Sequence, residues 1–181
     1  MKVFLVVLLF PVLILASEIK SDSFFQINTE WQNQDGKTVQ FKDFQGHPVV
    51  LSMVYMTCPF LCPTITSDIQ RIELKLSEKQ KKNTRFVLVS FDPERDTPKK
   101  MKAFMKKHKL DSERWVLLSS KKEPKLRELA GIMNFKYQKL EDGEFSHSYI
   151  IQALDKDGIP AARIEGANQD IKPFAEALSK L

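Results

Sequence analysis

The sequence predicts an α/β fold in which a central mixed sheet lies between helices, and three observations lead to this class. Short apolar runs, each long enough for a buried strand, alternate with segments of helical periodicity. The chain closes on a hairpin and a last helix, an ending that is typical of the thioredoxin-like arrangement. Its only two cysteines, Cys58 and Cys62, stand where a buried strand passes into the first long helix. In open α/β sheets this is where ligands and chemistry collect.

The first half of the chain supplies the hairpin, the central strand and that helix. Residues 24–28 and 38–41 are predicted as short strands around a turn at residues 34–36, which gives an N-terminal hairpin. The apolar run at residues 49–55 is the predicted central strand. The helix after the cysteines is indicated by apolar residues at helical spacing: Ile65, Ile69, Ile72 and Leu76.

The second half continues the alternation. Thr97 and Pro98 are a cap and a first residue for one helix, and Gly131 is expected to end another that starts at Pro124. Further strands are predicted at 85–91, 115–118, 148–154 and 160–164, with a turn at residues 157–158 before the last of them and a closing helix over 170–181.

Pro63 sets the local geometry expected at the cysteines. Because a proline disfavours the helical conformation of the residue before it, the helix should begin at or after Pro63. Cys58 and Cys62 then occupy a tight turn just before a helix N-terminus, where the free N–H groups favour an anion. We therefore expect at least one of the two thiols to have a lowered pKa.

Length and charge limit the possible partners. The 181 residues suggest one domain once a leader is removed, and the net charge of +5 comes largely from lysines in local clusters. No aromatic residues interleave with these clusters as base-stacking platforms would, so no nucleic-acid partner is expected.

The first residues read as an export signal. A short basic start is followed by an apolar run that contains Pro11 and ends on Ala16, which is typical of a secretory signal peptide at residues 1–16. The run is short for a membrane span. We expect a single exported domain at residues 17–181, in the periplasm or an equivalent compartment, with no membrane span in the mature chain. An uncleaved N-terminal anchor is the alternative.

Export changes what a cysteine pair can mean. A structural disulfide is the commonest use of cysteines in an oxidising compartment, but so short a loop gains little from one. A redox or soft-metal role fits better, and thiolates select ions such as Cu(I). An iron–sulfur cluster or a closed zinc site would need four ligands. Three histidines could assist: His147 before a predicted strand, His47 in a turn, and His108 at a solvated helix end.

Three motifs, taken in order, resemble the Sco (SCO/SenC) family. They are YxTCPxxCP at residues 55–63, VSFDPERDTP at residues 89–98, and FSHS at residues 145–148. The resemblance extends over residues 25–181. It implies a thioredoxin-like copper chaperone for the assembly of cytochrome c oxidase. Many relatives keep a membrane anchor, whereas the leader of this chain looks cleavable.

The resemblance also implies a ligand set. Cys58, Cys62 and His147 match the family's copper ligands, with Cu(I) or Cu(II) as the ion, and the two cysteines would form a disulfide when oxidised. The family's acidic loop matches Asp92 and Asp96. A carboxylate is a poor ligand for Cu(I), so we expect Asp96 to orient the site or act on it electrostatically. The alternative is that both aspartates only organise a turn and a helix start.

Three functions remain open on the sequence. The first is a chaperone that delivers copper to the copper-accepting subunit of a respiratory oxidase, with a thiol reductant or another copper carrier as a further partner. The second is a thiol–disulfide oxidoreductase that uses the Cys58–Cys62 dithiol, for instance to reduce the copper-site cysteines of the oxidase. The third is a thiol peroxidase, which would need an activating arginine, and no arginine lies close to the cysteines in sequence.

Overall fold

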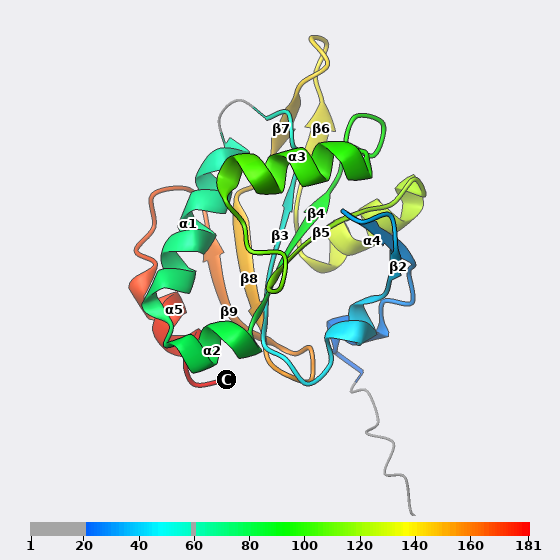
Figure 1. Ribbon diagram of the computed structural model, residues 1–181. Helices are drawn as coiled ribbons and strands as arrows, with labels where there is room; N and C mark the ends of the chain where they lie inside the picture. The colour runs from blue at the N-terminus through cyan, green and yellow to red at the C-terminus, as the bar shows by residue number, and fades with distance from the viewer. Residues whose placement is uncertain (1–20, 59–60) are drawn as a thin grey trace, which may run out of the picture.

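A seven-stranded sheet in the order β2-β1-β5-β4-β3-β8-β9 forms the centre of the protein (Figure 1). The computed structural model describes residues 21–58 and 61–181, so the expected signal peptide at residues 1–16 lies outside the described residues. The strands of this sheet are β1 (Trp31–Asn33), β2 (Thr38–Val39), β3 (Val49–Val54), β4 (Arg85–Ser90), β5 (Trp115–Ser119), β8 (Ile150–Leu154) and β9 (Pro160–Glu165). A separate two-stranded sheet consists of β6 (Tyr137–Lys139) and β7 (Phe145–His147).

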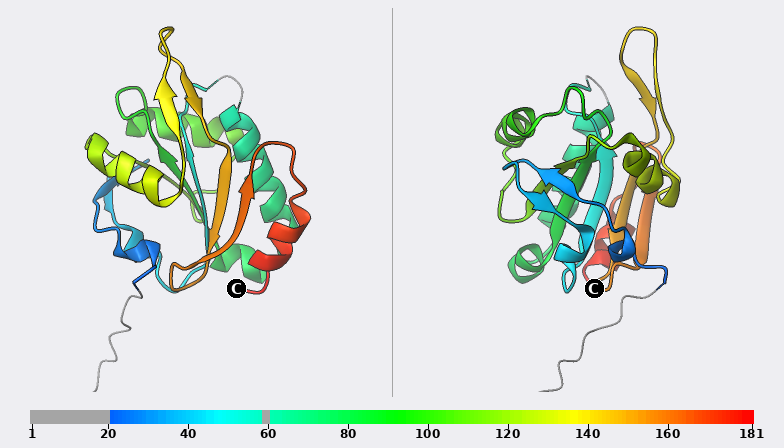
Figure 2. Two further views of the ribbon diagram at one scale, coloured as in Figure 1. Left: turned by 180° about the vertical axis from the view of Figure 1, so that it is seen from behind. Right: turned by 90° about the vertical axis from the view of Figure 1, so that its right-hand side faces the viewer.

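The sheet is mixed, as predicted. β3, β4 and β5 pair in parallel, whereas β8 pairs antiparallel with β3, and β1 pairs antiparallel with β5. Helices α1 (Leu61–Lys75) and α3 (Pro98–His108) cover one face, and α4 (Glu123–Ile132) covers the other (Figure 2). All six residues of β3 are buried, which explains why this strand reads as one apolar run. The remaining helices are α2 (Glu78–Asn83), α5 (Lys172–Leu178), and the 3-10 turns η1 (Phe24–Gln26) and η2 (Phe41–Phe44).

The N-terminal hairpin exists, but its first strand is not where it was predicted. Residues 24–26 form the 3-10 helix η1, which Ser23 caps by accepting a hydrogen bond from the backbone N–H of Phe25. The hairpin uses β1 and β2, with Trp31 opposite Val39. The buried phenylalanines of η1 resemble a strand in the sequence because two adjacent apolar residues fit either structure.

Two predicted helix ends are also wrong. Helix α1 begins at Leu61 rather than at Pro63, and a proline fits within the first turn because its missing N–H would have no intrahelical partner there. Gly131 lies inside α4 instead of ending it, and the cap is Met133. By contrast, the start of α3 is confirmed: Thr97 is the N-cap and its side chain accepts from the backbone N–H of Lys100.

The described N-terminus is fastened at the end of the molecule opposite to the β6–β7 sheet (Figure 2). Ser23 donates from its hydroxyl to the carbonyl of Asp157 at 2.6 Å, and Phe24 donates from its N–H to the carbonyl of Gly158 at 3.0 Å. Gly158 has φ of 81°, in the left-handed region. A Cβ there would come within 2.5 Å of the Ser23 hydroxyl, so this turn requires glycine.

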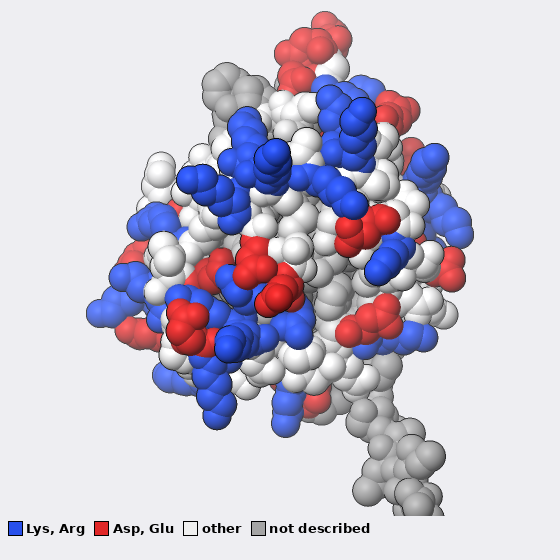
Figure 3. Space-filling model, viewed as in Figure 1, with Lys and Arg blue, Asp and Glu red and all other residues white. Residues whose placement is uncertain are grey.

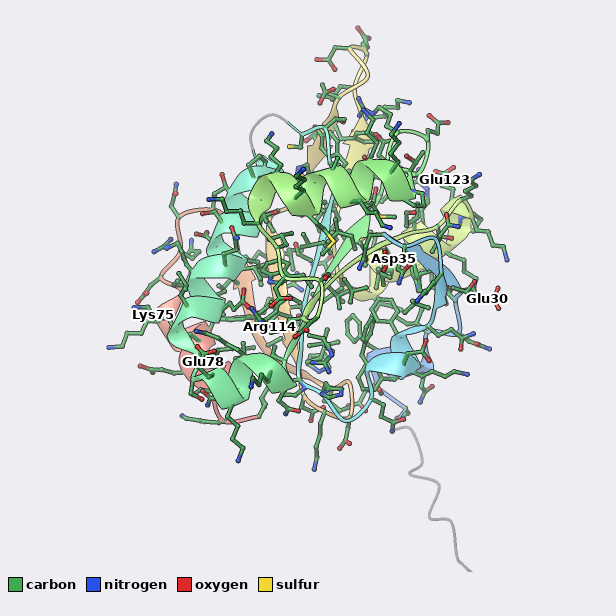
Figure 4. The ribbon with its side chains drawn as sticks, in the orientation of Figure 1. Glu30, Asp35, Lys75, Glu78, Arg114 and Glu123 are labelled. Atoms are coloured by element: carbon green, nitrogen blue, oxygen red, sulfur yellow. The ribbon has the colours of Figure 1, made fainter. Side chains whose placement is uncertain are left out.

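Polar contacts tie the first helix to the sheet. Arg114, labelled in Figure 4, donates from Nε to Glu73 at 2.8 Å, and the indole of Trp115 donates to the other oxygen of Glu73 at 2.9 Å. These contacts hold α1 against the start of β5. No helix within the described ranges 21–58 and 61–181 has the length and apolar character needed to cross a bilayer.

Charges of both signs gather at the end that carries the β6–β7 sheet. Lysines spread over the exposed side of α3, while acidic side chains mark the tip of the β6–β7 turn (Figure 3). Glu141 and Asp142 are exposed in that turn, and Leu140 beside them is 45% exposed.

Candidate metal centre

The predicted site residues meet at the carboxyl ends of two parallel strands. Val54, the last residue of β3, pairs with Ser90, the last residue of β4, so the segments that follow both strands lie together. A turn leads from β3 to the first cysteine, with the N–H of Cys58 donating to the carbonyl of Tyr55 at 3.3 Å. The second cysteine, Cys62, stands in the first turn of α1. Both thiols are therefore positioned by rigid elements on either side of a short loop.

Cys58, Cys62 and His147 come together as the sequence predicted. Nε2 of His147 lies 3.5 Å from Sγ of Cys62 and 4.0 Å from Sγ of Cys58. The three ligand atoms all lie within 4.8 Å of one another. Two sulfurs and one nitrogen at these separations form a set that one metal ion could contact with small adjustments.

The orientation of the imidazole suits a ligand. Nδ1 of His147 lies 2.8 Å from the carbonyl oxygen of Ser148. Because a carbonyl can only accept, Nδ1 must carry the proton, and in the neutral ring Nε2 then has a free lone pair. That lone pair faces the two sulfurs. A backbone carbonyl that fixes the tautomer in this way is the usual outer support of a metal-binding histidine.

Neither cysteine forms a disulfide in this structure, and both thiols are buried. The N–H of Cys62 donates to Sγ of Cys58 at 3.4 Å, so the helix N-terminus does present a donor to the first sulfur. Sγ of Cys62 accepts from the N–H of Tyr55 at 3.3 Å. Burial nevertheless raises the pKa of the Cys62 thiol, and its neighbour Cys58 raises it further. Cys62 is therefore not a thiol whose pKa is lowered, because desolvation outweighs the hydrogen bond donated by Tyr55, and the expected lowering at one or other of the two thiols stays a prediction.

Aromatic rings surround the histidine. The centroid of the His147 ring lies 5.3 Å from that of Phe91, 5.8 Å from Tyr55 and 5.9 Å from Phe135, with which it is stacked. This packing limits rotation of the imidazole and lowers the local dielectric. Phe91 and Phe135 could not be selected for this role from the sequence, because nothing in its pattern shows that three segments converge on one ring.

The two predicted aspartates are buried beside the site, and each has a different task. Asp96 accepts hydrogen bonds from the Ser90 hydroxyl at 2.6 Å and from the N–H of Met56 at 2.9 Å, which fixes the loop before Cys58. Asp92 forms an ion pair with Arg95. Burial raises the pKa of Asp96 to about 6. Asp96 therefore orients the cysteine loop, and the carbonyl of Asp92 also closes the turn before α3 by accepting from the N–H of Asp96.

The other two histidines lie elsewhere. Nδ1 of His47 contacts the carbonyl of Asn83 at 2.9 Å, and His47 precedes β3 whereas the cysteines follow it, so the two lie at opposite ends of this strand. His108 was expected to be solvated, but it is partly buried and its ring lies 4.2 Å from that of Phe104. The candidate site thus uses His147.

Sequence reasoning missed Arg95 and Glu144. Arg95 is distant from the cysteines along the chain, yet its guanidinium lies 5.5 Å from the ring centroid of Tyr55. It donates from Nη1 to Glu144 at 3.1 Å and from Nε to Asp92, so two of its three nitrogens bind carboxylates, while the buried Nη2 has no hydrogen-bond partner among the described residues. Two features of the sequence could have identified these residues: Arg95 falls within the second motif, and Glu144 lies three residues before His147.

The donor set determines which ions fit. Thiolate and imidazole ligands suit Cu(I), Cu(II) and zinc, whereas oxygen-seeking ions such as magnesium and calcium prefer carboxylates. Among the described residues no fourth histidine, cysteine or carboxylate joins these three ligand atoms, so a zinc ion would be left with an open position. A small set of soft ligands suits Cu(I). The fold and the site together define a thioredoxin-like domain with a candidate centre of two thiols and one imidazole.

Comparisons with known proteins agree with this class. The model of the SCO1/SenC family matches residues 20–181, so the chain belongs to this family. The SCO1 protein homolog of Bacillus subtilis (strain 168) is 29% identical over 100 residues, which cover 55% of this chain and 51% of that protein. The matched region thus spans about half the length of this curated relative.

Solved structures have the same fold. A SCO1/SenC family lipoprotein from Bacillus anthracis str. Ames gives a TM-score of 0.76 at 24% identity, covering 84% of this chain and 92% of that one. Arabidopsis thaliana ScoI, crystallised with copper bound, gives 0.72 at 22% identity, covering 83% and 93%. BsSco gives 0.70 at 25% identity, covering 84% and 92%, and is described as a cytochrome c oxidase assembly protein of the Sco family with a disulfide switch. The thioredoxin-like fold is thereby confirmed.

Proposed function

We propose that this protein binds one copper ion through Cys58, Cys62 and His147 and delivers it to the copper-accepting subunit of a respiratory cytochrome c oxidase. The observation that carries the proposal is the lone pair of Nε2 of His147, which faces two free thiols from 3.5 and 4.0 Å. A dithiol catalyst has no need of such an imidazole. Membership of the SCO1/SenC family and the copper-bound Arabidopsis ScoI support copper as the ion.

The copper is cargo, so the site must both hold and release it. Binding Cu(I) or Cu(II) displaces the thiol protons, because thiolates are the ligands. Oxidation of the two thiols to a disulfide would remove both sulfur ligands. Release can therefore be coupled to the redox state of the cysteines, with a thiol reductant or another copper carrier reloading the site.

A second candidate function rests on the same pair. The thiols are reduced and adjacent, so a thiolate could attack a disulfide on a partner and form a mixed disulfide. The second thiol would then release the partner as a dithiol, with two electrons passing from Cys58 and Cys62 to the target. The copper-site cysteines of an oxidase would be such a target.

Replacing His147 by alanine separates the two functions. Loss of one of three ligands should weaken copper binding at least about tenfold, and Cu(II) binding most, because imidazole suits the harder ion better. Exchange of the dithiol with a small disulfide should persist. Copper titration against a competing chelator, together with a thiol-exchange assay, measures both. Unchanged copper affinity in His147→Ala would remove the histidine from the site and favour the oxidoreductase.

We also propose that the domain works outside the cytoplasm, in the periplasm or an equivalent compartment, after removal of residues 1–16. The apolar run and small residue of the leader motivate this. Mass spectrometry of the exported fraction should find a chain that starts near Ser17. Recovery of the intact leader in membranes would instead establish an N-terminal anchor.

A further inference from the structure

The histidine ligand is carried by a small projecting element. His147 is the last residue of β7, and β7 pairs only with β6 among the strands of the described chain. We call residues 137–147 the finger; it projects from the end of the sheet in Figures 1 and 2. A two-stranded hairpin is marginally stable by itself. The position of the His147 ring therefore depends on what fastens the finger to the rest of the protein.

Glu144 joins the finger to both neighbouring segments, through one ion pair and one hydrogen bond. Arg95, in the loop after β4, donates from Nη1 to Oε1 of Glu144 in the finger at 3.1 Å. Nε of the same guanidinium donates to Asp92, whose side chain is only 3% exposed. The second oxygen of Glu144 accepts from the hydroxyl of Tyr55 at 2.8 Å. Glu144 is thus shared by the loop after β4 and the segment after β3.

Ring contacts complete the connection to the ligands. The guanidinium of Arg95 lies 5.5 Å from the ring centroid of Tyr55 and 5.6 Å from that of Phe145, within the range of a cation–π interaction. The backbone of Tyr55 donates to Sγ of Cys62, and its ring packs edge-on against His147. Tyr55 therefore contacts a sulfur ligand, the nitrogen ligand and the residue that binds Arg95.

We propose that Arg95 and Glu144 are positioning residues of the copper site, and this inference rests on the proposed copper-binding function. Their ion pair holds the finger against the loop after β4, and thereby keeps Nε2 of His147 within reach of both sulfurs. Neither residue contacts the metal. Their effect on copper binding passes through the histidine.

The chain contains a matched control for this pair. Lys139 and Glu94 also join the finger to the loop after β4, at 3.4 Å, but their side chains are 55% and 79% exposed. Exposed ion pairs contribute little. If any ion pair between the finger and the loop after β4 were enough to position His147, Glu94→Gln and Glu144→Gln would affect copper binding to a similar extent. If the inner network positions His147, only Glu144→Gln should matter.

The decisive experiment measures copper affinity of the reduced full chain, with folding checked by circular dichroism. Glu144→Gln keeps an acceptor but removes the charge, and it should weaken Cu(II) binding about tenfold, as loss of an outer support commonly does. Electron paramagnetic resonance should show weaker nitrogen coupling in this variant. Glu94→Gln should match the wild type within about twofold. Wild-type affinity and spectrum in Glu144→Gln would overturn the proposal.

A double-mutant cycle tests whether the effect passes through the histidine. In the His147→Ala background, Glu144→Gln should cause no further loss of copper affinity. An equal loss in both backgrounds would contradict the proposal, because the pair would then act on the thiols or on the whole fold.

The metal-free protein separates this inference from the proposed function. The ring resonances of His147 in nuclear magnetic resonance spectra should shift in Glu144→Gln and stay in place in Glu94→Gln. That result would support the positioning role whether or not the wild type binds copper. Failure of the wild type to bind copper would refute only the proposed function. Unchanged ring resonances in both variants would refute the positioning role.

Discussion

At the scale of single residues, hydrogen bonds and burial fix where the polar groups of the site direct their donors. Nδ1 of His147 points at the carbonyl of Ser148, and burial raises the pKa of the Tyr55 phenol, with Cys58 and Glu144 adding to the effect. The phenol therefore stays protonated and donates to Glu144.

Asp96 makes a prediction about pH. Burial raises its pKa from 3.8 to about 6, so the folded protein retains a proton that the unfolded chain releases. The folded state thus binds more protons between these values, and stability falls as the pH rises from about 4 to 6. Asp96→Asn should remove this dependence. The difference in free energy of unfolding between Asp96→Asn and the wild type should therefore shift in favour of the variant by roughly 2–3 kcal/mol from pH 4 to pH 7, because each unit of pKa change corresponds to about 1.4 kcal/mol.

Urea unfolding of the reduced, metal-free proteins across this pH range measures the difference. A gap between Asp96→Asn and the wild type that did not change with pH would mean that Asp96 titrates normally. The absolute stability of the variant is secondary, because the asparagine also has to satisfy Ser90 and the N–H of Met56.

At the scale of elements, the sequence correctly predicted the helices and strands whose local sequence patterns agree with their tertiary contacts. The buried run of β3 and the Thr97–Pro98 start of α3 are of this kind. The prediction failed where one local rule was used alone. Pro63 was expected to begin a helix that in fact starts at Leu61, and Gly131 was expected to end a helix that contains it. A proline is tolerated anywhere in the first turn, where the N–H groups have no intrahelical partner, and a glycine inside a helix costs only about 1 kcal/mol.

The turn at Gly158 allows an element to be tested apart from the site. Gly158→Ala would place a Cβ 2.5 Å from the Ser23 hydroxyl and 2.8 Å from the Phe25 ring, in addition to the strain of a positive φ. Gly36→Ala is the matched control, since its φ is 77° and nothing lies within 4 Å of its Cβ. Strain alone costs about 1 kcal/mol. Thermal unfolding should show a loss of at least roughly twice that for Gly158→Ala, with copper affinity unchanged.

Equal losses in the two glycine variants would mean that the N-terminal segment moves aside without cost. A fall in copper affinity in Gly158→Ala, with the fold intact, would mean that the two ends of the molecule are coupled. Neither is expected, because η1 packs on the turn at residues 155–158, opposite to the finger.

At the scale of the whole molecule, the chain assembles its site from three distant segments. The cysteines follow β3, the aspartates follow β4, and the histidine ends the finger, all at one edge of the sheet (Figure 1). The candidate ligands could be named from the sequence because the resemblance covered all three motifs. Their supports could not: Phe91, Phe135, Arg95 and Glu144 act through contacts that arise only when the segments converge.

The central claim is that two free thiols and one imidazole form a single copper site. It is tested most directly by the copper stoichiometry of the protein in its two redox states. Reduced protein, titrated with Cu(I) under anaerobic conditions, should bind one ion per chain, because both sulfurs and Nε2 of His147 are available. The same protein oxidised to the Cys58–Cys62 disulfide should bind almost none, because both thiolate ligands are gone. Comparable copper uptake by the oxidised form, or none by the reduced form, would contradict the claim.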